Sequence, residues 1–106
     1  MATGHERIDR RSIALHRAIA EKLRTHPELM PTALANIDRW YGTAGSTRAY
    51  LDEWRRILAQ PVELVMAAMV EDSEEMTALR QSTPFSGILT PQERWAVYRQ
   101  FQEDRS

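Results

Sequence analysis

Cysteine is absent from this sequence of 106 residues, and glycine is scarce. Without thiols the chain lacks disulfides, thiolate zinc sites and cysteine nucleophiles. Its four glycines are scattered and do not form a phosphate-binding loop. No apolar run approaches the roughly 20 residues that a bilayer-spanning helix needs, and the polar start of the chain is unlike a signal peptide. We therefore expect a cytoplasmic protein without a membrane span or a bound cofactor.

The composition is that of an ordinary globular domain, with 42% hydrophobic and 27% charged residues. A chain of this length corresponds to one domain, which we expect to cover residues 1–106 with a flexible tail over 1–7. Residues 1–60 hold ten basic and seven acidic side chains, whereas residues 61–106 hold four and eight. The two parts therefore carry net charges of +3 and −4.

Apolar residues recur at every third or fourth position along most of the chain, which is the spacing of a helical face. In the first part this periodicity predicts helices over 9–25, from Pro27 or Pro31 to about 41, and over 47–59. Asp9 is a candidate N-cap for the first of them. β-branched residues do not alternate with polar ones over any length, so no strand is predicted.

The remaining part predicts two or three more helices. An apolar stripe runs through residues 61–81, but Asp72 and Glu75 have capping-box spacing. The pattern therefore leaves open whether this segment forms one helix or two. Thr90 and Glu93 have the same spacing around a proline and predict a last helix that ends near residue 104. The expected fold is a compact, all-α, single-domain bundle of four to six helices.

Several aromatic residues are expected in the core. Trp40, Trp54 and Trp95 each lie on the apolar face of a predicted helix. The irregular segment 81–91 is rich in turn-forming residues but also carries Phe85, and apolar loops of this kind usually pack against a core. We therefore expect the three tryptophans to fill one core.

The three histidines are the candidates for metal or acid–base chemistry. His5, His16 and His26 include no pair at the i, i+4 spacing that places two ligands on one helical face. Next to the apolar stripe, His16 is interpreted as a hydrogen-bonded histidine at the edge of the core. His26 is interpreted as a cation at a helix C-terminus. We therefore predict no catalytic, cofactor-binding or metal-binding residue, and an enzyme would need His16 beside a carboxylate in a pocket.

The arginines raise the alternative of a small DNA-binding regulator. Arg10, Arg11, Arg55 and Arg56 are the candidate phosphate contacts. However, the turn at 42–46 is longer than that of a helix-turn-helix motif, and a pI near 6.3 lacks the basic character of an autonomous nucleic-acid binder. Nucleic-acid binding is therefore the second hypothesis.

The charge pattern favours a protein partner. An acidic block and an apolar loop segment are the candidate partner-binding residues, namely Glu71, Asp72, Glu74, Glu75, Pro84 and Phe85. A solvated helix face and a loop packed on the core are the alternative interpretations of the same residues.

Three stretches resemble small all-helical bacterial proteins of unassigned function that are encoded beside toxin-like enzymes. These are SIALHRAIA at 12–20, ANIDRW at 35–40, and LRQSTPF at 79–85 followed by the Glu93-Arg94 pair. The resemblance implies an antitoxin or related accessory role and transfers no site residues. The leading hypothesis is thus a non-enzymatic protein-binding module whose partner is a toxin enzyme. A homodimer is compatible with the size of the chain.

Overall fold

The computed structural model describes the backbone of residues 4–43, 45 and 48–103, and the side chains of residues 10–43, 45 and 48–100. This part of the chain forms six α-helices and one 3-10 helix, and it contains no strand. The elements are α1 (Gly4–Thr25), the 3-10 helix η1 (Pro27–Leu29), α2 (Met30–Tyr41), α3 (Arg48–Leu58), α4 (Val62–Met69), α5 (Glu74–Arg80) and α6 (Pro91–Glu103). The expected all-α bundle is confirmed. No described helix combines the length and the apolar character that crossing a bilayer requires.

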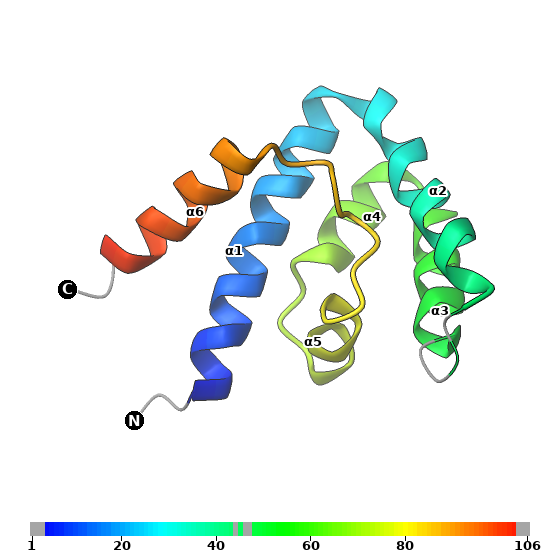
Figure 1. Cartoon of the computed structure of the whole chain (residues 1–106), viewed down its shortest axis with the longest axis horizontal. Helices are drawn as coiled ribbons and strands as arrows, with labels where there is room; N and C mark the ends of the chain where they lie inside the picture. The colour runs from blue at the N-terminus through cyan, green and yellow to red at the C-terminus, as the bar shows by residue number, and fades with distance from the viewer. Residues whose placement is uncertain (1–3, 44, 46–47, 104–106) are drawn as a thin grey trace.

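The helix α4 lies at the centre of the arrangement, between α1 on one side and α3 on the other (Figure 1). Helix α2 packs against the outer side of α3, and α6 packs against α1. The connection over 81–90 leads from α5 back to the start of α6 (Figure 1). The candidate phosphate-binding arginines on α1 and those on α3 are therefore separated by α4.

The first helix begins earlier than the sequence pattern predicts. Helix α1 starts at Gly4 instead of residue 9, so residues 4–7 of the expected tail are helical in backbone, while residues 1–3 lie outside the described part. Asp9 lies inside the helix and is not its N-cap. No proline lies between Gly4 and Thr25, so nothing in this stretch prevents the helix from continuing toward the N-terminus beyond the apolar stripe on which the prediction depended.

The question of one helix or two over residues 61–81 is resolved by a break after Met69. Ser73 has an extended backbone conformation, and its hydroxyl oxygen accepts a hydrogen bond from Met76 N at 3.2 Å. The N-cap of α5 is thus Ser73, one residue after the predicted Asp72. At the start of α6, Thr90 N donates to the Glu93 carboxylate at 2.7 Å and Glu93 N donates to Thr90 Oγ1 at 3.1 Å. This capping box confirms the prediction for α6.

Trp54 forms the centre of the core, with none of its surface exposed. Its Nε1 donates to the carbonyl oxygen of Leu79 at 2.9 Å, and its ring meets Phe85 edge-on at 5.3 Å between centroids. The other two tryptophans differ from the prediction, since Trp40 is half-buried and Trp95 is 58% exposed. Because α6 packs against α1 with one side only, Trp95 lies on a side that no described element covers.

The connection over 81–90 packs onto the core through buried Phe85, Ile88 and Leu89. From α2, the buried Asn36 holds this segment in place because its Nδ2 donates to two carbonyl oxygens, those of Pro84 and Ser86, each at 2.9 Å. Polar backbone groups of a buried loop need such partners. The apolar segment therefore closes the core, as the sequence analysis considered.

We predict that Asn36→Ala lowers the free energy of unfolding by about 2 kcal/mol, because two loop carbonyls lose their donor in a buried environment. Urea denaturation measures this change. Asp38→Ala is the matched control on the same helix, since Asp38 is exposed and its ion pair with Arg55 is expected to contribute less than about 1 kcal/mol. An equal loss in both variants would show that Asn36 has no special role in holding the loop.

Candidate functional site

Four exposed carboxylates gather where α4 ends and α5 begins. Glu71 and Asp72 lie in the connection between the helices, and Glu74 and Glu75 form the first turn of α5. We call these four residues the acidic corner. They adjoin a solvent-open hollow of about 430 Å³, which is lined by Asp72, Ser73, Glu74, Thr77, Ala78 and Gln81.

Local structure explains how the acidic corner is held. Ser73 caps α5, and carboxylates in the first helical turn interact favourably with the positive end of the helix dipole. Arg80, at the other end of α5, is buried and donates to the carbonyl oxygens of Met69 at 3.1 Å and of Glu71 at 2.8 Å. These bonds tie the connection to α5. The acidic corner is therefore carried by an anchored turn.

The charge of the acidic corner is not neutralised by an ion pair within the described residues. The ion pairs among the described residues join Lys22 to Glu93, Arg24 to Glu21, His26 to Glu28, Arg55 to Asp38 and Arg56 to Glu53. All of them lie on other elements. The corner thus presents negative charge to solvent and to any molecule that approaches it.

Two residues of the predicted partner surface belong to the core instead. Pro84 is almost fully buried, and Phe85 is 2% exposed between the rings of His16 and Trp54. Neither is part of an exposed surface, because the apolar loop segment packs against His16 on α1 and Trp54 on α3. The hollow instead includes Ser73, Thr77 and Gln81, which sequence reasoning missed. Their spacing of four residues, which places side chains on one helix face, is the signal that points to them.

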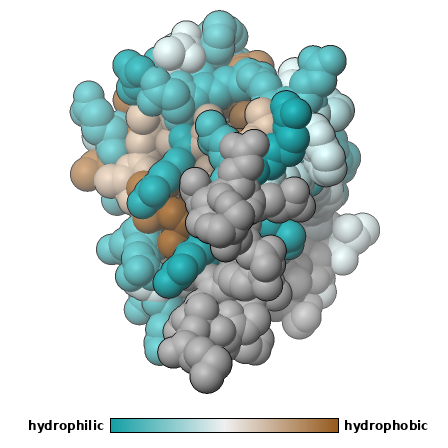
Figure 2. All heavy atoms as spheres, turned by 90° about the vertical axis from the view of Figure 1, so that its left-hand side faces the viewer, coloured by the Kyte–Doolittle hydropathy of each residue, from teal (hydrophilic) through white to brown (hydrophobic). Residues whose placement is uncertain are grey.

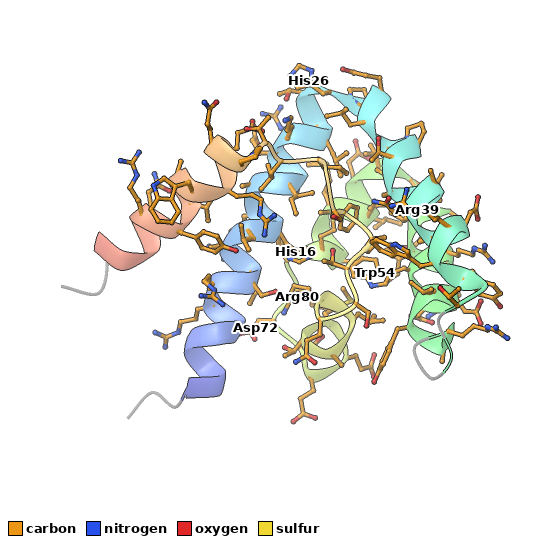
Figure 3. The ribbon with its side chains drawn as sticks, viewed as in Figure 1. His16, His26, Arg39, Trp54, Asp72 and Arg80 are labelled. Atoms are coloured by element: carbon orange, nitrogen blue, oxygen red, sulfur yellow. The ribbon has the colours of Figure 1, made fainter. Side chains whose placement is uncertain are left out.

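His16 is locked inside the fold, with 3% of its surface exposed. Its Nδ1 lies 2.8 Å from the carbonyl oxygen of Ser12, which can only accept, so Nδ1 carries the proton. Nε2 therefore accepts a hydrogen bond from the Thr83 hydroxyl at 2.9 Å. Figure 3 shows His16 and Arg80 in the interior between α1 and α5, with Trp54 toward α3. The hydrogen-bond partners of both ring nitrogens are thus a backbone carbonyl and a hydroxyl, and neither is a carboxylate.

Burial lowers the pKa of His16 to about 4, because the charged imidazolium loses its hydration. The hydrogen bond to the Ser12 carbonyl opposes this shift, and the positive charge of Arg80 adds to it. At neutral pH the ring is therefore uncharged. The prediction of a hydrogen-bonded histidine holds, although His16 lies within the core rather than at its edge.

The other histidines show no grouping for metal binding in the described part of the chain. The side chain of His5 lies outside the described residues, and His26 at the end of α1 contacts Glu28 at 3.2 Å. Among the described side chains, no three groups of the kinds that ligate metals come together.

The candidate phosphate-binding arginines are not brought together. Arg10 and Arg11 lie on α1, whereas Arg55 and Arg56 lie on α3, on the far side of α4. Arg55 donates to Asp38 at 2.8 Å, and Arg56 pairs with Glu53. The four residues therefore form two separate groups, and half of them already neutralise carboxylates.

A different grouping of arginines surrounds the aromatic end of α2. Arg48 and Arg55 approach the Tyr41 ring at 5.0 and 4.3 Å from its centroid, and Arg39 lies over Trp40 at 5.6 Å. These distances are those of cation–π contacts. Arg55 is one of the candidate phosphate contacts of the sequence, but these ring contacts depend on how α2 and α3 pair and are not visible in the sequence.

An apolar pocket of about 350 Å³ opens where the end of α1 meets the start of α4. Its lining residues are Leu23, Arg24, Pro27, Val62, Glu63 and Met66. Leu23 is fully buried at this place, whereas Val62 is 42% exposed. The pocket lies beside the first turn of α4, whereas the acidic corner follows the last turn of the same helix.

No family model, no curated protein and no solved structure matches this chain. Function is therefore inferred from the geometry described above.

Proposed function

We propose that this protein is a non-enzymatic binding module that docks a basic surface of another protein on its acidic corner. The observation that carries the proposal is the group of four exposed carboxylates beside a hollow, without an ion pair to any described residue. A protein partner with lysine or arginine side chains supplies the complementary charge.

The hollow suits one long basic side chain. Its volume of about 430 Å³ is within the range of ligand pockets. Asp72 and Glu74 supply negative charge at its wall, and Thr77 and Gln81 supply polar groups along the α5 face. An arginine or lysine of the partner would remain in contact with water in this solvent-open hollow, and its charge would form charge-assisted hydrogen bonds with Asp72 and Glu74.

The concrete form of the proposal is the neutralisation of a toxin-like enzyme encoded beside this chain. The support for this form is the resemblance of the segments 12–20, 35–40 and 79–85 to antitoxin-like proteins. Because Pro84 and Phe85 are buried, we assign the contact with the enzyme to the acidic corner and not to the loop.

The test is affinity purification of the tagged chain from its native cells, with and without nuclease, followed by co-expression with the identified partner. We expect a stoichiometric protein that survives nuclease. The double variant Glu74→Lys and Glu75→Lys should bind it at least about tenfold more weakly, because two attractive charges become repulsive. Growth rescue by the wild-type chain but not by this variant would support the toxin form.

A double variant with the same change in net charge provides the control. Glu28→Lys and Asp52→Lys alter exposed acids on η1 and α3, away from the acidic corner. We expect this variant to keep wild-type affinity. Equal weakening in both double variants would mean that overall charge, and not the corner, governs binding, and the docking surface would be rejected.

A second candidate function is nucleic-acid binding on the α2–α3 face. It is favoured by the contacts of Arg39, Arg48 and Arg55 with Trp40 and Tyr41, which combine guanidinium groups and aromatic rings as many phosphate-binding surfaces do. The same purification distinguishes it, because this function predicts specific nucleic acid that is lost on nuclease treatment and a salt-sensitive affinity.

A further inference from the structure

Trp95 is the most exposed large apolar side chain of the described residues, at 58% of its surface. It lies on α6, whose main packing partner is α1. The neighbouring Arg94 and Arg99 are exposed and form no ion pair with a described residue. Figure 2 looks onto the side of the molecule that α1 and α6 form, where apolar side chains appear between hydrophilic ones. An exposed tryptophan with flanking arginines has the composition of an interface anchor.

The apolar pocket between α1 and α4 has the opposite character. It is lined by the fully buried Leu23, the half-buried Met66 and the exposed Val62. Two exposed charged residues, Arg24 and Glu63, complete the lining, and the charge of Arg24 is neutralised by its ion pair with Glu21. Glu63 is exposed and forms no ion pair with a described residue. The pocket therefore offers apolar surface for a ring and a negative charge beside it.

Trp95 does not fill the pocket of its own chain. Helix α6 packs on α1, the pocket lies where α1 meets α4, and Trp95 is absent from the pocket lining and exposed. The pocket is therefore open to the Trp95 ring of a second molecule.

We propose that a second copy of this chain inserts Trp95 into the apolar pocket. Arg99 lies one helical turn beyond Trp95 on the same face of α6, and we place it against Glu63 at the pocket rim. Each copy carries both the ring and the pocket, so a two-fold arrangement makes the contact twice and closes the dimer. The charge complementarity of Arg99 and Glu63 is what selects a second copy as the occupant.

The dimer is independent of the proposed partner binding. The pocket lies at the first turn of α4, whereas the acidic corner follows its last turn, so the corner stays accessible in each copy. Loss of the dimer and loss of partner binding can therefore be measured separately.

The test is the molar mass in solution, measured by light scattering and by sedimentation over a range of protein concentrations. We expect twice the monomer mass of 12.3 kDa as concentration rises. Trp95→Ala should raise the dimer dissociation constant about thirtyfold, the effect of a central tryptophan in an interface. At concentrations where the wild type is monomeric, the melting temperature of this variant should match the wild-type value, because the side chain is exposed in the monomer.

A charge exchange tests the orientation of the contact. Glu63→Arg and Arg99→Glu should each weaken the dimer, and the two substitutions in one chain should restore it, because the ion pair is then re-formed with reversed signs. Tyr50→Ala is the control, since this aromatic residue on α3 is 41% exposed and lies outside the proposed contact.

Three results would overturn the proposal: a monomer at every concentration, a dimer that Trp95→Ala leaves intact, or a dimer that Tyr50→Ala weakens equally. Failure of the charge exchange to restore the dimer would remove the pairing of Arg99 with Glu63 and, with it, the proposed arrangement.

Discussion

Replacement of Trp54 by alanine is expected to lower the free energy of unfolding by about 4 kcal/mol, close to the limit of what a domain of this size tolerates. The ring is fully buried, and the substitution removes its contacts and leaves a cavity in the only large core of the described residues. It also leaves the Leu79 carbonyl without the Nε1 donor that lies 2.9 Å away.

Urea denaturation followed by circular dichroism measures this loss. Trp54→Phe should lose less, because it keeps most of the ring but not the hydrogen bond. Trp95→Ala, measured at a concentration where the wild type is monomeric, is the control, since 58% of that side chain is exposed and its replacement should change the free energy of unfolding of the monomer by less than about 0.5 kcal/mol. A similar loss in Trp54→Ala and Trp95→Ala would contradict the described core.

Acidification is expected to destabilise the fold through His16 by about 3 kcal/mol between pH 6.5 and about 4. Burial lowers the pKa of His16 in the folded protein, so in this window the unfolded chain binds a proton that the folded chain does not. Stability is therefore complete above the unfolded pKa of 6.5 and falls as the pH approaches 4.

The measurement is the free energy of unfolding as a function of pH for the wild type and for His16→Gln. Glutamine keeps a donor and an acceptor but does not titrate, so its curve should be flatter in this window. The contribution of Glu93 to stability is lost at lower pH than that of His16, because its hydrogen bond with Lys22 lowers the pKa of Glu93 from 4.5 to about 2. Parallel curves for the two proteins between pH 6.5 and 4 would show that His16 is not responsible.

The elements that depend on local interactions are the ones that the sequence predicts well. The period of apolar residues places most of the helices, because a helix that packs by one face needs that spacing. The capping box of Thr90 and Glu93 places the start of α6, because both of its hydrogen bonds join residues within one turn. Even the break between α4 and α5 had a local signal, although Ser73 and not Asp72 is the cap.

The residues that the sequence misplaced depend on contacts between distant segments. Trp95 and Trp54 lie on similar apolar stripes, but α3 is enclosed by α2 and α4, whereas α6 meets mainly α1. Phe85 belongs to an irregular segment, and it enters the core because Asn36 on α2 and His16 on α1 hold that segment from two sides. A pattern along the chain does not show which faces find a partner.

The candidate surfaces also include some features that the sequence determines locally and others that depend on contacts between distant segments. Sequence alone determined the all-helical class of this protein and the four exposed carboxylates of the acidic corner, because helical periodicity and the charge of a contiguous run are local properties. Only the tertiary structure decided that Pro84 and Phe85 are buried, that the arginines of α1 and α3 lie apart, and that Leu23 and Val62 share a pocket. Burial and separation are set by the packing of helices far apart in the chain, and that packing depends on which apolar faces cover one another.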